Sequence, residues 1–371
     1  MIRPGTRTLI ALDLLRFACA LMVAVFHYGA GLPLLPPPGA ATLLTGMAVD
    51  HSWIPFVDTG WIGVELFFVV SGFVIAWSAE GSSAAGFLGR RALRLLPAAW
   101  LCCSLTAVVL LACSTLPAAV VGGHWLGSMA FWPTGTPIDP SYWTLAIEVN
   151  FYLLVALVLR GGSGLDRIEQ LGVALGCASL TYWIASCIIQ TAPADNRYVQ
   201  LTLLPHGCFF ALGILLRVRQ RTGTTAVRTA FLLLFTVAAA LEIAEHRREV
   251  CPDYPAYIPA LLLFALGMLP IVFAERLQPW LERRIPVSLA VTLGLITYPL
   301  YLLHHEIGAM TAATILRRGG SFLPAVAAAL AVSLGLAWIV VRFGEPRLRA
   351  GLRRLGRRPS AGAVPLGQVS V

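Results

Sequence analysis

Three ionisable side chains interrupt an apolar stretch near the start of the sequence. The stretch LDLLRFACALMVAVFHYG (residues 12–29) contains Asp13 and Arg16 near one end and His27 near the other. His27 follows Arg16 by 11 residues, which on an α-helix is about 16 Å and almost three full turns, so both side chains share one face. An unpaired ionisable group at membrane depth costs roughly 3 kcal/mol. One face of this helix is therefore expected to serve both halves of a membrane.

Three later apolar segments also contain groups that can transfer protons. They are GWIGVELFFVVSGF with Glu65, SYWTLAIEVNFY with Glu148 and Tyr152, and TYPLYLLHHE with Tyr298, Tyr301, His304, His305 and Glu306. An imidazole with a carboxylate is suited to general acid–base catalysis near neutral pH. The sequence predicts that Glu65, Glu148 and the late histidines lie at a depth similar to that of His27.

An arginine cluster follows the segment that contains Glu65. In GRRALRLLP, Arg91 and Arg94 are three residues apart and share a face if the segment is helical. Guanidinium groups bind phosphates in a bidentate manner, so the cluster suits a polyanion. The alternative is that these arginines only set the membrane topology. Arg16, within a span on the same side, favours the anion site.

Structural roles remain open for several of these groups. Glu65 could hydrogen-bond a neighbouring helix, and His304 and His305 lie close to a membrane interface. Ser71 is interpreted as a small residue that allows close helix packing, and not as a nucleophile. The remaining histidines are expected in loops or in packing; they are His51, His124, His206 and His246.

The composition is that of an integral membrane protein. Of 371 residues, 58% are hydrophobic and 12% are charged, and the mean hydropathy is +0.78; soluble proteins have about 25% charged residues. The net charge is +9, but the arginines lie in short loops, which does not favour nucleic-acid binding. Neither a CxxC pair nor a His/Cys metal spacing occurs, so no metal is expected.

Apolar segments predict an all-α bundle of about ten transmembrane helices. They cover residues 9–29, 60–78, 98–121, 143–160, 168–190, 200–217, 228–244, 257–275, 286–309 and 323–342. With the N-terminus inside, 21 arginines are cytoplasmic and five are external, which agrees with the positive-inside rule. Both termini are then cytoplasmic. Residues 1–350 form the transmembrane domain, and residues 351–371 are expected to be a basic, disordered tail.

The ordered motifs resemble those of the acyltransferase-3 family of membrane-bound acyltransferases. The matching elements are Arg16-x10-His27, GVELFFVVSGFVI (63–75), RRALRLLP (90–97), YWTLAIEVNFY (142–152), YPLYLLHHE (298–306) and, in loosened form, GEPRLR (344–349). Thr144 stands where the family usually has serine. The resemblance covers about residues 8–350, although residues 160–285 match in hydropathy alone and are expected to determine acceptor specificity.

The resemblance implies an enzyme that transfers an acyl group, most simply acetyl, from cytoplasmic acyl-CoA to a hydroxyl of an extracytoplasmic or membrane-associated acceptor. A surface or exported glycan is favoured, and polysaccharide, lipopolysaccharide O-antigen, glycolipid and macrolide are all compatible. It implies His27 as the catalytic group, assisted by Glu148. Arg16, Arg91 and Arg94 would bind acyl-CoA. Glu65, Tyr152, Tyr301 and His305 are candidates for the acceptor mouth. The expected location is the bacterial inner membrane, and the chain resembles members without an extracytoplasmic hydrolase-like domain.

A transporter is the main alternative. Intramembrane His and Glu residues often form proton relays, and many transporters contain inverted repeats. The two halves of this sequence show no convincing similarity, and no P-loop or GxGxxG motif is present, which argues against an ATP-driven pump. A sensor or scaffold would leave the acid–base residues without a role.

Overall fold

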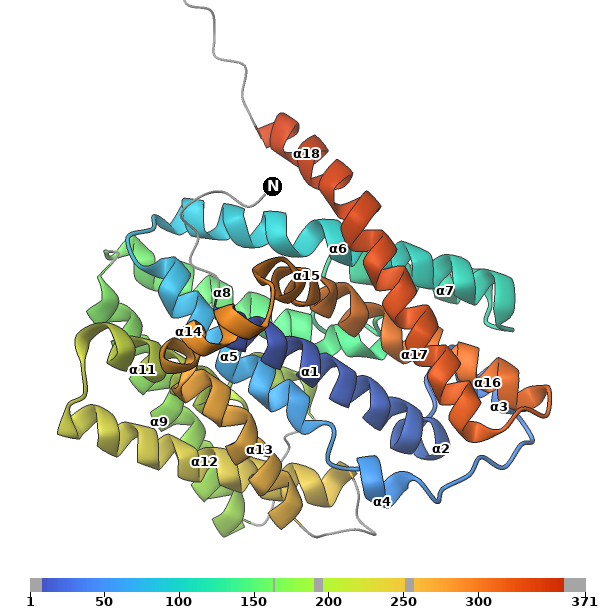
Figure 1. The fold of residues 1–371 in the computed structure, drawn as a ribbon, viewed down its shortest axis with the longest axis horizontal. Coiled ribbons are helices and arrows are strands. Elements are labelled where there is room, and N and C mark those ends of the chain that lie inside the picture. The colour runs from blue at the N-terminus through green and yellow to red at the C-terminus, as the bar shows by residue number, and fades with distance from the viewer. Residues whose placement is uncertain (1–8, 163, 190–195, 251–256, 357–371) are drawn as a thin grey trace, which may run out of the picture.

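The computed structural model describes residues 9–162, 164–189, 196–250 and 257–356, and all regular elements in these ranges are helices (Figure 1). The predicted all-α class is confirmed. Of the predicted disordered tail, residues 357–371 lie outside the described residues, whereas residues 351–356 end the last helix.

The first half of the chain contributes nine helices to the described ranges. They are α1 (Ile10–Phe26), α2 (Leu32–Leu34), α3 (Pro38–Leu44), α4 (Ile54–Val57), α5 (Ile62–Ala79), α6 (Ala84–Cys113), α7 (Ala118–Met129), α8 (Trp143–Arg160) and α9 (Leu165–Ile189). A 3₁₀ turn, η2 (Pro140–Tyr142), precedes α8.

The second half continues the bundle. Its helices are α10 (Arg197–Leu201), α11 (Gly207–Thr222), α12 (Ala226–Val250), α13 (Ile258–Val272), α14 (Ala274–Arg284), α15 (Val287–Leu303), α16 (Ala309–Arg317), α17 (Phe322–Ile339) and α18 (Glu345–Gly356). In the part of the chain that the structure describes, three π-helical turns join consecutive helices: η1 (His27–Gly31), η4 (His304–Gly308) and η5 (Val340–Gly344).

Within the described ranges, eight helical segments are long and apolar enough to cross a membrane. The number is nine if α13 and α14, which are bent by 79° at their junction, form one broken span. The chain is therefore a multi-pass membrane protein. The predicted sixth span, 200–217, corresponds to α10 and α11; α11 has 16 residues and is shorter than the other spans. The count of ten and the cytoplasmic termini stay predictions.

Helix α11 lies at the centre of the packing and is buried over most of its length. It packs tightly against α5 because two glycines let the backbones touch. A Cβ atom at Gly72 would overlap the backbone of Phe210, and a Cβ atom at Gly213 would overlap the carbonyl of Val69. Small residues allow this close approach in membrane bundles. The contact fixes the position of α5, which carries several residues of the site.

The predicted third span, 98–121, has the wrong boundaries. Helix α6 begins at Ala84, where the side chain of the N-cap residue Ser83 accepts a hydrogen bond from the amide of Gly86, 3.2 Å away. Arg90, Arg91 and Arg94 are therefore helical residues and not loop residues. Pro97 lies inside this helix and leaves the carbonyl of residue 93 without its helical donor.

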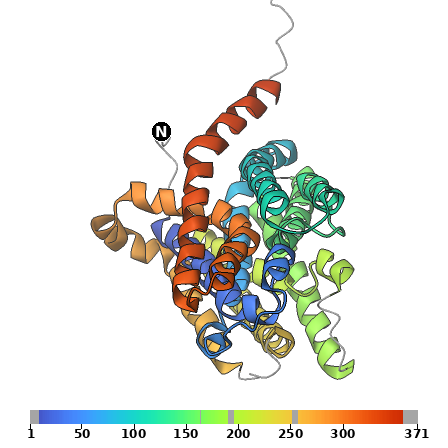
Figure 2. The same cartoon turned by 90° about the vertical axis from the view of Figure 1, so that its right-hand side faces the viewer.

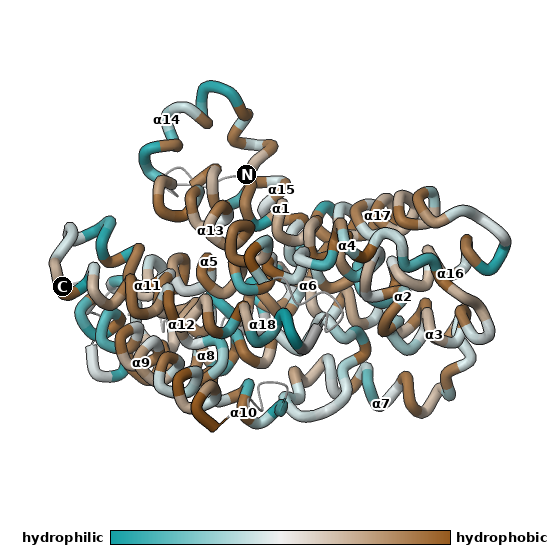
Figure 3. Tube along the Cα trace, turned by 90° about the horizontal axis from the view of Figure 1, so that it is seen from below, coloured by the Kyte–Doolittle hydropathy of each residue, from teal (hydrophilic) through white to brown (hydrophobic). Residues whose placement is uncertain are grey.

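A side chain from the other end of the chain replaces that donor. Arg349 of α18 donates a hydrogen bond through Nε to the carbonyl of Leu93, at 3.1 Å. The proline in α6 thus creates a docking point for α18. Helices α17 and α18, joined by η5, form a long rod whose last part extends beyond the bundle (Figures 1 and 2). Helix α14 projects from the bundle, contacts α1 and combines hydrophilic with hydrophobic residues (Figure 3).

Candidate active site

The two π-helical turns η1 and η4 face each other and carry the histidines of the site. His27 is the first residue of η1, and His304 is the first residue of η4. The two turns are in contact. A π-helical turn inserts an extra residue into a helix, redirects the side chains around it and is frequent at functional sites. Two such turns place imidazoles from helices far apart in sequence next to each other.

His27 and His304 share a hydrogen bond whose direction follows from their partners. His27 Nδ1 and His304 Nε2 are 2.8 Å apart, and His304 Nδ1 is 2.8 Å from the carbonyl oxygen of Tyr301. A carbonyl can only accept, so His304 Nδ1 carries the proton. In the neutral ring His304 Nε2 is then an acceptor, and His27 donates through Nδ1. This leaves the lone pair of His27 on Nε2, where it can act as a base.

His305 covers one face of the His27 ring. The two rings stack with their centroids 3.9 Å apart and an angle of 13° between planes. The main chain of η4 is anchored separately, since the hydroxyl of Tyr28 donates to the carbonyl of His304 at 2.9 Å. Ser333 also bonds this hydroxyl. The His27 ring is thus held by a hydrogen bond at its edge and by an imidazole at its face.

Two buried carboxyl groups position η4 from its other side. The amide of Glu306 donates to Asp139 Oδ2 at 2.9 Å, and the amide of Gly39 donates to Glu306 Oε1 at 2.5 Å. Asp139 precedes the span that contains α8, and burial raises its pKa to about 6 although hydrogen bonds from Ser141 and Glu306 oppose the shift. Asp139 therefore connects the start of α8 to the histidine turn.

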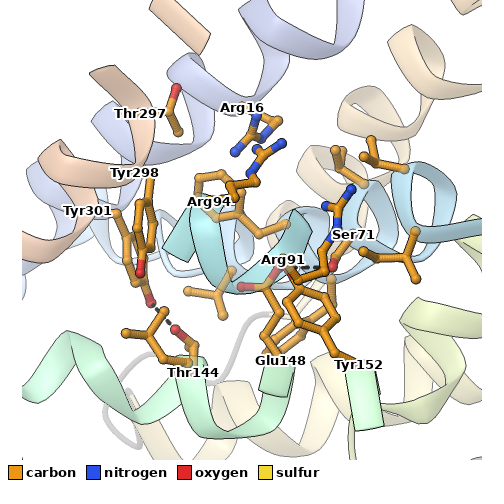
Figure 4. Close-up of a pocket in the computed structure, with 17 residues that line it drawn as sticks. Arg16, Ser71, Arg91, Arg94, Thr144, Glu148, Tyr152, Thr297, Tyr298 and Tyr301 are labelled. Carbon is orange, nitrogen blue, oxygen red and sulfur yellow. Dashed lines mark hydrogen bonds between the residues drawn. The ribbon is translucent and has the colours of Figure 1, made fainter. Parts of the chain in front are cut away.

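A second group of polar residues lies around a narrow cavity of about 90 Å³ (Figure 4). Arg16 from α1, Arg91 and Arg94 from α6, Glu148 and Tyr152 from α8, and Tyr298 and Tyr301 from α15 all line it. The predicted shared face of Arg91 and Arg94 is confirmed, because both point into this cavity. The three predicted donor-binding arginines therefore converge.

Glu148 belongs to this arginine-lined cavity. The hydroxyl of Tyr152 donates a hydrogen bond to its carboxylate, and Ser71 Oγ donates to the same oxygen at 3.2 Å. Among the described residues, no hydrogen bond connects Glu148 with His27. The expected His–Glu pair is therefore not formed, because Glu148 faces the arginines from one side of α8 and His27 faces η4. Tyr152, predicted at the acceptor mouth, lies with Glu148 and has the guanidinium of Arg91 5.9 Å from its ring.

Glu65 lies outside both groups. Its side chain is buried between α5, the start of α11 and α12, beside His206 and Glu242. The similar depth predicted for Glu65 and His27 stays a prediction, and the structure groups Glu65 with His206 and Glu242 and not with His27. His206, expected in a loop or in packing, is its neighbour.

Tyr301 connects the arginine-lined cavity with the histidines. It lines the cavity, its hydroxyl lies 3.3 Å from that of Thr144, and its ring centroid is 5.6 Å from that of His304. Figure 4 shows Tyr301 and Thr144 joined at one end of the cavity. Tyr301 therefore lies between the arginine-lined cavity and His304.

A second cavity, of about 390 Å³, continues from the arginines toward α18. It shares Arg16, Arg94 and Tyr298 with the first cavity and adds Arg90, Arg349 and Arg353. The sequence alone did not single out Arg349 and Arg353, because they lie in a basic C-terminal region where arginines are typical of membrane topology. The sequence also did not predict the role of Asp139 or the hydrogen bond between His304 and His27. For Asp139, the available signal was the Asp-Pro-Ser sequence at 139–141, which is typical of a helix start.

Comparison with known proteins decides the family. The sequence profile of the acyltransferase-3 acyltransferase domain matches residues 9–342. The chain belongs to the acyltransferase-3 family. It is also similar to Nodulation protein 10 of Rhizobium leguminosarum bv. viciae, with 26% identity over 228 residues, which is 56% of this chain and 59% of that protein. The match thus spans less than two thirds of that relative. No solved structure matches the chain.

Membership of this family confirms the resemblance that the sequence motifs indicated. The family profile and the apolar helices together support a multi-pass membrane protein with an acyltransferase-3 domain.

Proposed function

We propose that this acyltransferase moves an acyl group, most simply acetyl, from acyl-CoA to a hydroxyl of an extracytoplasmic glycan, and that it lies in the bacterial inner membrane. The observation that carries the proposal is the arrangement of an arginine-lined cavity that ends at Tyr301, directly beside the His27–His304 pair. The cavity offers a cationic end for the donor, and the histidine pair offers a base for the acceptor.

The donor end fits a ligand that carries several phosphates. The larger cavity gathers arginines from three helices: Arg16 on α1, Arg90 and Arg94 on α6, and Arg349 and Arg353 on α18. Asp13 and Glu345 also line it, and they pair with Arg16 and Arg349. Five guanidinium groups against two carboxylates leave a net positive site. Such a site favours the phosphates of coenzyme A, which guanidinium groups bind in bidentate fashion.

The narrow cavity is suited to the linear arm of the donor. It runs from Arg16 and Arg94 to Tyr301, and its other walls are largely apolar side chains such as Phe67 and Val74. A thin passage of this kind excludes a glycan but accommodates an extended chain. Glu148, held by Tyr152 and Ser71, lies along the passage, where its carboxylate can accept a hydrogen bond from an amide of the arm.

The chemical step uses the lone pair on His27 Nε2. His27 removes the proton of the acceptor hydroxyl as the oxygen attacks the thioester carbonyl. A C–O bond forms, the C–S bond breaks, and the proton on His27 passes to the departing thiolate. The Nδ1–H of His27 remains hydrogen-bonded to His304 throughout, so that the imidazolium formed in the step keeps its orientation.

The test combines acyl transfer with donor binding. A host lacking the gene is complemented with wild-type protein, His27→Ala or Arg94→Gln at equal membrane levels, and surface glycans are analysed by mass spectrometry. We expect an acyl increment with wild type that both variants lose. Purified His27→Ala should still bind acetyl-CoA, whereas Arg94→Gln should bind it more weakly. Normal acylation by His27→Ala would overturn the mechanism, and unchanged donor affinity of Arg94→Gln would overturn the donor site.

A further inference from the structure

A second cluster of titratable groups lies away from the acyl-transfer site. Glu65 of α5, His206 at the start of α11 and Glu242 of α12 each offer one ligand atom, and these atoms all lie within 4.8 Å of one another. The three residues are 2%, 5% and 1% exposed. The α5 helix and the consecutive helices α11 and α12 therefore bring one imidazole and two carboxylates to a single buried point.

Several polar atoms of Glu65 and His206 lack a partner at this point. Glu65 Oε2 and both ring nitrogens of His206 have no hydrogen-bond partner among the described residues. His206 Nδ1 and Glu242 Oε1 are 3.5 Å apart, which is an ion-pair distance and not a good hydrogen bond. Buried polar groups normally have partners, and unsatisfied ones indicate an ion or water that completes the site.

We propose that Glu65, His206 and Glu242 bind a divalent transition-metal ion, with zinc as the best fit. One imidazole nitrogen and two carboxylate oxygens form a donor set that zinc accepts, at bond lengths of about 2.0–2.2 Å. Ligand atoms around such an ion lie roughly 3.3 Å apart by tetrahedral geometry, so the cluster needs only a small contraction. The fourth position stays open to water.

The charges around the cluster agree with a dication. The two carboxylates neutralise the charge of the ion, and a neutral His206 adds none. Arg197 is a cation whose charge acts on His206. Its guanidinium is engaged elsewhere, because Nε donates to the carbonyl of Pro133 at 2.6 Å and Nη1 donates to Gln200 at 3.2 Å.

The ion would tie α5, α11 and α12 together beside the acyl-transfer site. The Phe68 ring, 5.1 Å from the ring of His206, lines the arginine-lined cavity on its other side. One aromatic layer thus separates the metal from the passage for the donor. The proposed ion has a structural role and takes no part in acyl transfer, so the two proposals can fail independently.

The experiment measures metal content in the full-length protein purified in detergent. Wild type, Glu65→Gln, Glu242→Gln and the matched control Glu245→Gln are incubated with zinc, manganese(II) or iron(II), desalted and analysed by mass spectrometry for metals. Glu245 lies on the same helix as Glu242 and pairs with the exposed Arg248. We expect one ion per chain in wild type and in the control, and at least about tenfold lower affinity in the two ligand variants, since even second-shell losses cost 10–100-fold.

Cobalt(II) keeps the test decisive if the ligand variants fold poorly. Cobalt(II) bound to wild type at low coordination number should give visible absorption bands that zinc displaces and that a chelator removes. The same chelator should lower the melting temperature of wild type and of Glu245→Gln. Three results would each overturn the proposal. They are an absence of bound metal in wild type, a metal content in Glu65→Gln and Glu242→Gln equal to that of wild type, or a spectrum of hydrated cobalt(II) alone.

Discussion

Removal of the His304 side chain should slow acyl transfer without weakening donor binding. In the structure His304 Nε2 accepts the hydrogen bond from His27 Nδ1 at 2.8 Å, and this bond fixes the lone pair of His27 on Nε2. In His304→Leu, the buried Nδ1–H of His27 loses its acceptor. An unsatisfied buried donor costs about 1–3 kcal/mol, and tenfold in rate corresponds to about 1.4 kcal/mol. We therefore expect a rate loss of about 5- to 150-fold.

A matched variant separates the lost acceptor from a general disturbance. His304→Gln presents a side-chain oxygen that can accept from His27 Nδ1 and should recover much of the rate. The main chain of η4 is held in both variants by the Tyr28 hydroxyl, which bonds the His304 carbonyl. The arginines that surround the donor site are also unchanged, so the affinity for acetyl-CoA should equal that of wild type.

The assay follows the initial rate of glycan acylation after induction of each variant at equal protein level, with acetyl-CoA affinity measured on purified protein. A wild-type rate in His304→Leu would refute the argument that His304 sets the tautomer of His27. Equal losses in His304→Leu and His304→Gln would show that the acceptor atom is not the cause. A fall in donor affinity together with rate would show that the variant disturbs the passage itself.

Three further predictions concern Arg349 in the larger cavity, Tyr301 at the end of the narrow cavity, and the carboxyl group of Asp139 that holds η4. Arg349→Gln should weaken acetyl-CoA binding, measured by calorimetry, because the larger cavity loses one cation and α18 loses its hydrogen bond to the Leu93 carbonyl. An unchanged affinity for acetyl-CoA would contradict the assignment of the larger cavity as the phosphate site. Tyr301→Phe should keep or raise the transfer rate by at most about fivefold, because it removes a hydrogen bond of about 1 kcal/mol that must open for the donor; a large loss would assign the hydroxyl a chemical role. The raised pKa of Asp139 favours its protonated form in the folded state, so its stabilising contribution is complete below pH 3.8 and is lost as pH rises through about 6. The melting temperature of wild type relative to Asp139→Asn should therefore fall between pH 4 and 6, whereas Asp50→Asn, at an exposed carboxylate, should not remove this dependence.

The sequence identified many residues of the site but not their grouping. Helical periodicity placed Arg91 and Arg94 on one face, and this depends on the local backbone alone, so it could be predicted. Depth along a helix is also local, and it correctly separated Arg16 from His27. The direction of a side chain around a bundle is not local. Glu65 and Glu148 lie on different sides of the core because of the α5–α11 packing, which sequence depth does not specify.

The π-helical turns were a second feature that periodicity could not supply. An ideal helix predicts one stripe for Tyr298, Tyr301 and His305, whereas η4 begins at His304 and changes the angular position of the residues after it. His304 thereby faces His27, and the ring of His305 stacks on the ring of His27. The proposed metal ligands could not be predicted from the sequence for a related reason. Residues 65, 206 and 242 have no characteristic spacing, and only the packing of three helices brings them together.

The placement of Tyr301 between the two groups has a mechanistic consequence. A base beside a thioester that water can reach would also promote hydrolysis, so the donor and the base need separation until an acceptor is present. Tyr301 contacts the donor passage through its side chain and holds His304 through its carbonyl. Rotation of the side chain alone would open the passage and leave the His304 bond in place, because the carbonyl belongs to the main chain. In the proposed mechanism, the thioester would then reach His27 without disturbing the tautomer that makes His27 a base.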